Sequence, residues 1–334
     1  GNLIILLIVL LWLISGNYTN KFKLIIQSKL LIASIIFFGL HVLGLLWTND
    51  LEWGIHIVRK MWYFLLLFPI LHSIVIKENI HKYIASFLLA ITVTEILSYS
   101  VWFEIIEPFK NATIYNPTPF MSHISYNPIL AFAIYIVLHR LLIQRDMGKI
   151  QIFLYGFFGL SMSINMFITG GRAGQVAYFV MLTILVFQFF KYSKIKALFI
   201  SIFLFLTIVL SAYQLSPIFN ERVDDGIKNY AKFSQDNEAS RASSIGYRMT
   251  FQLNSLEIIK KHPLIGVGTG DFPQEYKKVN MVNTPGMANA TNPHNMYILI
   301  TTQLGILGLI SFFSIFYFQF KIAFSSTNIL VRNV

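Results

Sequence analysis

A glycine-rich segment at 169–174, Thr-Gly-Gly-Arg-Ala-Gly, is the first place in this sequence where chemistry is expected. It forms a predicted tight turn between two apolar runs, so Arg172 stands where a new helix begins. A guanidinium there adds its charge to the positive end of the helix dipole, a combination that binds anions. Gly171 in the same turn is a supporting candidate. The alternative is that Arg172 only anchors the chain among lipid headgroups.

Arg248 is a second candidate for binding an anion. It follows Gly246 at the start of an amphipathic run from Tyr247 to Lys261. Its guanidinium could hold a phosphate through two parallel hydrogen bonds, which lysine cannot reproduce. The alternative is a solvated or ion-paired side chain, which is common for a single arginine on a polar loop.

The third candidate is His294, in Asn292-Pro293-His294-Asn295 just before the last apolar run. With Asn292 as N-cap and Pro293 as the first helical residue, His294 would lie in the first turn of a helix. The positive end of a helix disfavours imidazolium, so we expect a neutral imidazole that accepts a proton. Asn295 is a supporting candidate. The alternative is an interfacial histidine without a chemical role.

Other motifs carry weaker signals. Glu95 falls inside an apolar run, where an acid is either functional or a neutral carboxyl bonded to a neighbouring helix. Asp224 and Asp225 lack a third ligand at metal-site spacing and are interpreted as solvated surface. The glycines of 266–270 do not follow a nucleotide-binding strand, and no Walker lysine motif is present. We therefore expect no metal, no cofactor and no ATP-driven pump in this chain.

The composition indicates that these residues belong to a membrane protein. Of 334 residues, 55% are hydrophobic and 12% are charged, so the apolar surface exceeds what one soluble core buries. The runs do not alternate as barrel strands do. We predict an all-α polytopic transmembrane bundle with about nine spans. The expected spans are 2–15, 30–47, 61–76, 83–103, 129–143, 150–168, 174–190, 197–214 and 296–320.

Basic residues predict the orientation of these spans. The net charge of +11 could suggest nucleic acid, but most Lys and Arg lie in alternate short connections, as in cytoplasmic loops. The short connections on the other side hold only Arg59, Lys60, Lys110 and Arg172. We therefore expect no nucleic-acid partner, an outward-pointing N-terminus and an extracytoplasmic long loop.

The long loop sets the predicted domain organisation. Residues 1–214 are expected to form the first eight spans, 215–295 a helical extracytoplasmic domain, and 296–334 the last visible span and a cytoplasmic end. Apolar residues at helical spacing predict a helix over 247–261, which Pro263 ends. We expect this domain to lie over the outer ends of the spans.

Three motifs taken together resemble the O-antigen ligase and polymerase superfamily of bacterial envelopes. They are the turn at 169–174, the Arg248-led helix that runs into His-Pro-Leu-Ile-Gly-Val-Gly at 262–268, and Pro293-His294-Asn295 followed by Gln-Leu-Gly-Ile-Leu-Gly-Leu at 303–309. The likeness covers residues 155–312. Members of that superfamily have about twelve spans, so we expect further helices beyond the ends of this sequence.

The resemblance implies a polytopic glycosyltransferase of the GT-C kind in the bacterial inner membrane, among membrane lipids, with its active site facing the periplasm. Ligases of the superfamily move a glycan from undecaprenyl diphosphate to a lipid A–core acceptor without a metal. By motif, Arg172 and Arg248 match arginines that hold the diphosphate, and His294 matches the general base. The implied mechanism is direct displacement with inversion.

Three other functions stay open. A polymerase of the same superfamily would use the same donor and leaving group with a different acceptor. A ligase could instead glycosylate protein side chains. A transporter or flippase would bind a lipid-linked sugar without chemistry, and acids near the bilayer midplane would favour it. Glu95 is the only ionisable candidate at that depth.

Overall fold

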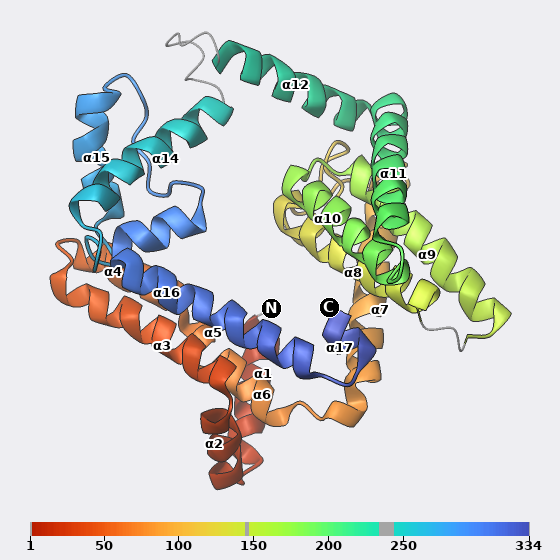
Figure 1. Ribbon diagram of the computed structural model, residues 1–334, viewed down its shortest axis with the longest axis horizontal. Helices are drawn as coiled ribbons and strands as arrows, with labels where there is room; N and C mark the ends of the chain where they lie inside the picture. The colour runs from red at the N-terminus through yellow and green to blue at the C-terminus, as the bar shows by residue number, and fades with distance from the viewer. Residues whose placement is uncertain (1, 144–146, 234–243, 334) are drawn as a thin grey trace. The chain divides into compact units, whose positions relative to one another are not determined.

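The computed structural model describes residues 2–143, 147–233 and 244–333, and the described residues are mostly helical (Figure 1). The isolated β-bridge between Thr113 and Asn116 is the only extended pairing within these ranges. The elements are α1 (Asn2–Ile14), α2 (Tyr18–Gln27), α3 (Lys29–Leu43), η1 (Gly44–Trp47), α4 (Leu51–Lys60), α5 (Trp62–Leu65), α6 (Leu67–Ile74), η2 (Lys77–Asn79), α7 (Ile80–Trp102), α8 (His123–Ile143), α9 (Lys149–Ile168), α10 (Arg172–Phe189), α11 (Lys194–Leu215), α12 (Pro217–Phe233), α14 (Ser244–Lys261), α15 (Phe272–Asn283), α16 (Met296–Ser325) and α17 (Ile329–Asn333).

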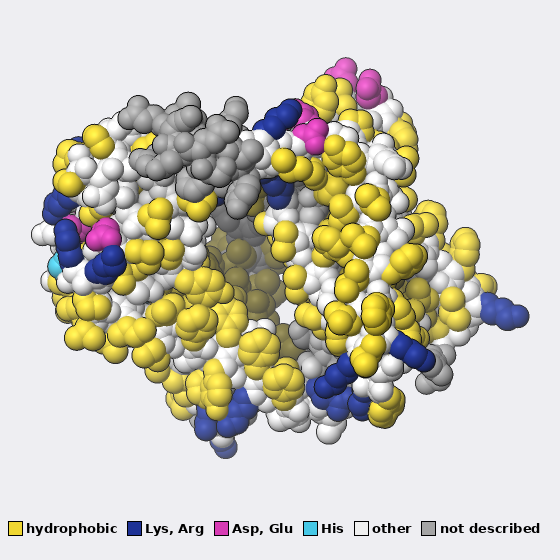
Figure 2. Space-filling model, turned by 45° about the horizontal axis from the view of Figure 1, so that its top comes forward, with side chains coloured by type: hydrophobic (Ala, Val, Ile, Leu, Met, Phe, Trp, Pro, Cys, Tyr) yellow, Lys and Arg dark blue, Asp and Glu magenta, His cyan; other side chains and the backbone are white. Residues whose placement is uncertain are grey.

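The helices confirm an all-α polytopic membrane fold. Among the described helices, seven are long and apolar enough to cross a bilayer, and the number rises to nine if each of two bent helix pairs is one span. These pairs are Leu3–Ile14 with Tyr18–Gln27, bent by 116°, and Leu51–Lys60 with Trp62–Ile74, bent by 51°. Hydrophobic side chains cover much of the described surface in Figure 2, as expected for helices that face lipid.

The chain forms two compact units. Unit 1 comprises Gly1–Lys77 and Lys228–Thr327, and unit 2 comprises Glu78–Ile227 and Asn328–Val334. In unit 2 the core is centred on α8, where Leu130 and Ile134 are buried among side chains of α9 and α10. In unit 1 α3 packs along α16, and the rings of Phe37 and Phe312 lie 5.4 Å apart.

Helix α16 is broken at Gly305, whose backbone has φ 61° and ψ −159°. The segment 263–268 fills the break with backbone hydrogen bonds. Val267 N–H donates to the Thr302 carbonyl at 2.9 Å, and Ile306 N–H donates to the Pro263 carbonyl at 2.9 Å. A Cβ at Gly305 would stand 2.2 Å from the Leu264 carbonyl, so only glycine fits there. The glycine-rich stretch at 266–270 thus has a structural role, because its backbone hydrogen-bonds to α16 at the break.

Asp271 joins this segment to the connection that follows α3. Its carboxylate is 1% exposed and accepts hydrogen bonds from the Thr48 hydroxyl at 2.7 Å and from the backbone N–H groups of Asn49 and Asp50 at 2.8 Å. The Asn49 side-chain amide donates to the second oxygen at 2.9 Å. These bonds link two parts of unit 1 that are far apart in sequence.

Replacing Asp271 by Ala is expected to destabilise unit 1 by about 3 kcal/mol or more, because it leaves several donors without an acceptor. Thermal unfolding of the purified protein in detergent measures the effect. Glu257→Ala is the control, since that carboxylate only pairs with Lys260 on an exposed helix face. Equal midpoints for the two variants would contradict the role given to Asp271.

Candidate functional site

The turn at 169–174 has the geometry predicted from the sequence. Gly171 is the N-cap of α10, and Arg172 is its first residue, with an exposed side chain. Asn127 of α8, which is fully buried, fixes the turn: its Oδ1 accepts from the Thr169 hydroxyl at 2.7 Å and its Nδ2 donates to the Gly171 carbonyl at 3.3 Å. The guanidinium therefore projects from a rigid helix N-terminus, where anions are favoured.

Close packing explains the glycines of this turn. A Cβ at Gly171 would stand 2.6 Å from Asn127 Nδ2 and from the His123 carbonyl oxygen. A Cβ at Gly174 would stand 2.2 Å from the Asn127 Cβ. Helices α8 and α10 thus cross where small residues allow their backbones to approach, as is common between membrane helices.

Glu95 lies within α7 and is 3% exposed. Its Oε1 accepts a hydrogen bond of 2.5 Å from the Ser161 hydroxyl of α9, so the carboxyl is bonded to a neighbouring helix. One turn further along α9, Asn165 donates to the Ser98 hydroxyl at 3.0 Å, and its carbonyl accepts from the Thr169 hydroxyl at 3.2 Å. Buried polar groups therefore run along α9 from Glu95 to the Arg172 turn.

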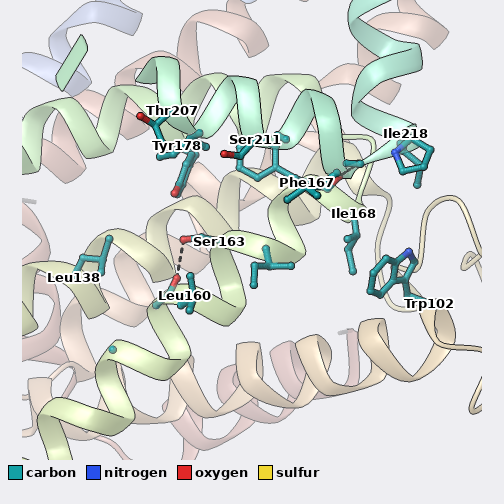
Figure 3. Close-up of a pocket in the computed structure, with 18 residues that line it drawn as sticks. Trp102, Leu138, Leu160, Ser163, Phe167, Ile168, Tyr178, Thr207, Ser211 and Ile218 are labelled. Carbon is teal, nitrogen blue, oxygen red and sulfur yellow. Dashed lines mark hydrogen bonds between the residues drawn. The ribbon is translucent and has the colours of Figure 1, made fainter. Parts of the chain in front are cut away.

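A cavity of about 600 Å³ lies in unit 2 among α9, α10, α11 and the start of α12 (Figure 3). Its lining is mainly apolar, with Leu160, Phe167 and Ile168 from α9, and Figure 3 shows the hydroxyl groups of Ser163, Tyr178, Thr207 and Ser211 around it. Phe167 and Ile168 come directly before Thr169. Two lining residues of the apolar cavity therefore precede, in sequence, the turn that carries Arg172.

His294 does not lie in a helix, and the prediction that placed it in a first turn was wrong. Helix α16 begins at Met296, and Asn295 is its N-cap, accepting from the N–H groups of Tyr297 at 3.0 Å and Ile298 at 3.3 Å. Asn292 instead accepts from the His294 N–H at 2.7 Å. Asparagine side chains favour such local turns as readily as helix caps, and the second asparagine of the motif takes the cap.

The backbone of His294 is left-handed, with φ 55°. This conformation costs a residue with a Cβ about 1–2 kcal/mol, and such strain concentrates at functional sites. The imidazole is exposed and stacks on the ring of Phe251, with centroids 6.1 Å apart and an interplanar angle of 22°. A strained turn and an aromatic ring thus hold His294 while its edge stays accessible.

Arg248 lies on α14 one helical turn before Phe251, and its side chain is exposed. Arg248 and His294 therefore both belong to unit 1, and the ring of Phe251, on the same helix as Arg248, contacts His294. Arg172 belongs to unit 2. Within the described ranges no group of three or more His, Asp or Glu side chains is arranged to hold a metal ion.

Comparison with known proteins shows a family likeness over the second half of the sequence. Residues 157–313 match the family model described as O-Antigen ligase, a range that contains the Arg172 turn, Arg248 and His294. The match supports a relationship of this part of the chain to the O-antigen ligase and polymerase superfamily. The chain is also 26% identical over 206 residues to an uncharacterized protein of Haemophilus influenzae. That alignment covers 58% of this chain and 49% of the relative, so the chain spans about half of the relative's length.

Two parts of the candidate site were not predicted from the sequence. Asn127, which fixes the Arg172 turn, is followed by Pro128 directly before the apolar run 129–143, and that Asn-Pro pair is a signal for a residue at the start of a helix. Phe251, which supports His294, looks like any other apolar residue of an amphipathic helix.

Replacing Gly174 by Ala is expected to lower the stability of unit 2 by about 1–3 kcal/mol, because the added methyl group overlaps Asn127. Chemical denaturation of the purified protein measures this change. Gly156→Ala in α9 is the matched control, since nothing lies within 4 Å of its added Cβ. The control should match or exceed wild-type stability. A Gly174 variant as stable as the control would exclude the close helix crossing.

Proposed function

We propose that the chain is an O-antigen ligase-type glycosyltransferase that moves a glycan from undecaprenyl diphosphate to a lipid A–core acceptor. The observation that carries the proposal is the exposed Arg172 at the start of α10, on the turn that follows Phe167 and Ile168, two lining residues of an apolar cavity of about 600 Å³. A cation next to an apolar cavity suits a diphosphate joined to a prenyl chain. The proposed location is the bacterial inner membrane, with the site open to the periplasm.

Stabilisation of the leaving group is the task proposed for the arginines. As the glycosidic bond to the diphosphate breaks, its electron pair stays on the departing oxygen. Arg172 would bind the developing charge together with the positive end of the α10 dipole, and Arg248 would add a second planar fork of donors. Neither role needs a metal ion.

Deprotonation of the acceptor is the task proposed for His294. The acceptor hydroxyl attacks the anomeric carbon from the side opposite to the diphosphate, so the configuration inverts. The imidazole accepts the hydroxyl proton as the new bond forms. The strained backbone of His294 and its stacking on Phe251 support this role, because a base must be held in one orientation.

His294→Ala is expected to lower the transfer rate by roughly 10²- to 10⁴-fold, the usual contribution of a general base, while the protein still inserts into membranes. Transfer is measured with purified protein, lipid-linked donor and lipid A–core acceptor. His81→Ala is the control, because His81 is an exposed imidazole among the predicted cytoplasmic lysines.

Near-normal transfer by the His294 variant would remove the proposed mechanism. The product distinguishes the other functions. Capped lipid A–core indicates a ligase, longer lipid-linked glycan indicates a polymerase, and no product from the wild-type protein indicates a carrier without chemistry.

Arg172→Ala and Arg248→Ala are each expected to lower kcat/KM roughly 10²-fold, the effect of losing one charge-stabilising donor. Lysine at either position should restore little of the lost kcat/KM, because its ammonium group cannot form two parallel hydrogen bonds to a phosphate. If both arginines act on one diphosphate, the double variant should lose less than the product of the two single effects. Arg140→Lys, on the predicted cytoplasmic side, is the control. Fully multiplicative effects would argue against a shared diphosphate.

A further inference from the structure

Unit 1 contains a cavity that none of the proposed catalytic residues lines. It has a volume of about 460 Å³, within the range of roughly 300–1,000 Å³ that is usual for small-molecule sites. Its lining comes from three places: the end of η1, the segment that fills the break in α16, and the start of α15. The lining residues are Trp47, Asn49, residues 262–267, Asp271 and Glu275.

The walls of this cavity combine apolar surface with free hydrogen-bonding groups. Trp47, Leu264 and Ile265 are 36%, 66% and 51% exposed. Among the described contacts, none involves the indole N–H of Trp47, the Oδ1 of Asn49 or the ring nitrogens of His262. The cavity therefore presents both donors and acceptors around apolar faces.

The charge of the lining argues against a phosphate and for a neutral group rich in hydroxyls. Two carboxylates line the cavity, whereas the lining contains no Lys or Arg. Asp271 is occupied by the donors of residues 48–50, and one oxygen of Glu275 pairs with Lys278 at 2.5 Å. The other Glu275 oxygen stays available as an acceptor. Carboxylate and amide oxygens accept from sugar hydroxyls, and an aromatic ring packs against the C–H face of a sugar.

The helices that flank the cavity place it at the edge of the hydrocarbon layer. Trp47 ends the candidate span Lys29–Trp47, and tryptophan favours the membrane interface. Helix α16 has 30 residues and breaks at Gly305. The part after the break, about 20 residues, is by itself long enough to cross roughly 30 Å of hydrocarbon. A sugar attached to a membrane lipid would lie at this depth.

We propose that this cavity binds a saccharide unit of the acceptor glycolipid, an inference that rests on the proposed function. The sugar packs its C–H face on Trp47 and Ile265. Its hydroxyl groups donate to Glu275 and to Asn49 Oδ1, and one accepts from the Trp47 indole N–H. The cavity thereby selects the acceptor, while Arg172, Arg248 and His294 act on the donor and on the proton.

Binding of a lipid-free probe tests the proposal without requiring catalysis. Core oligosaccharide released from lipid A is titrated calorimetrically into the full chain in nanodiscs. Trp47→Ala and Glu275→Gln should each raise the dissociation constant roughly tenfold or more, as expected when a hydrogen bond to a charged group or a stacking face is lost. Trp47→Phe keeps an aromatic face for the sugar and should raise the dissociation constant less than Trp47→Ala does.

Matched controls come from the same unit. Glu257 pairs with Lys260 three residues later, as Glu275 pairs with Lys278, so Glu257→Gln reproduces the loss of such an ion pair outside the cavity. Trp53→Ala removes an indole from α4 that does not line the cavity. Both controls should bind the oligosaccharide like the wild type. Cavity variants that bind as tightly as these controls would overturn the proposal, as would failure of the wild-type protein to bind the probe.

Kinetics separate this proposal from the proposed function. Glu275→Gln should raise the KM for the acceptor roughly tenfold and leave kcat and the donor KM near wild type. Wild-type protein that binds the oligosaccharide through Trp47 but forms no product would refute the transferase and keep the saccharide site. Normal transfer with an unchanged acceptor KM in both cavity variants would refute the saccharide site and keep the transferase.

Discussion

The break in α16 imposes the constraint on which the architecture of unit 1 depends. A helix interrupted at Gly305 leaves backbone N–H and C=O groups that lipid cannot solvate. Residues 263–268 satisfy them, and Asp271 then binds the connection after α3. The candidate saccharide cavity is formed by these same segments. α14 ends directly before this segment and α15 begins directly after it, so the break also positions Arg248 and Phe251.

Unit 2 also contains buried backbone and polar groups that need hydrogen-bond partners, and side chains supply them. Its candidate residue, Arg172, sits on a turn fixed by a buried asparagine amide, and two glycines let α8 and α10 approach closely. The polar groups between Glu95 and Thr169 are bonded to one another along α9, so little polar surface is left unpaired inside the apolar unit. The exposed charge of Arg172 therefore stands on backbone that a neighbouring side chain holds in one conformation.

The sequence predicted the features that depend on local pattern. Apolar runs located the seven long helices of the described residues, whereas the runs at 2–15 and 61–76 each fall in a bent helix pair. The helix expected over 247–261 is found as Ser244–Lys261, ending just before Pro263. The glycine-rich turn placed Arg172 at a helix start. The His294 prediction failed because two asparagines competed for the same cap, and the choice between them depends on energies too close for pattern to rank.

Features that depend on contacts between distant residues were not predictable. The need for glycine at 305 is understood only from its contact with the segment 263–268, which fills the helix break. Asp271 likewise binds residues more than 200 positions away. A single sequence contains no signal for such pairs, because each partner has an ordinary local environment. The cavity lined by Trp47 and Glu275 was missed for the same reason, since its walls come from separate parts of the chain.

The long-range bond from the Thr269 hydroxyl to the His41 carbonyl, across 228 positions, also sets an order of assembly. During synthesis α3 emerges long before the segment that binds its C-terminal end, whereas residues 78–227 of unit 2 are contiguous. This contiguous part of unit 2 can therefore pack before α3 meets its partners, since domains tend to fold as units during synthesis. The bonds from Tyr135 and Gln188 to the Asn333 carbonyl are added later. The early helices of unit 1 therefore insert without their long-range hydrogen-bond partners. Their packing is completed only after residues 263–269 and α16 have been synthesised.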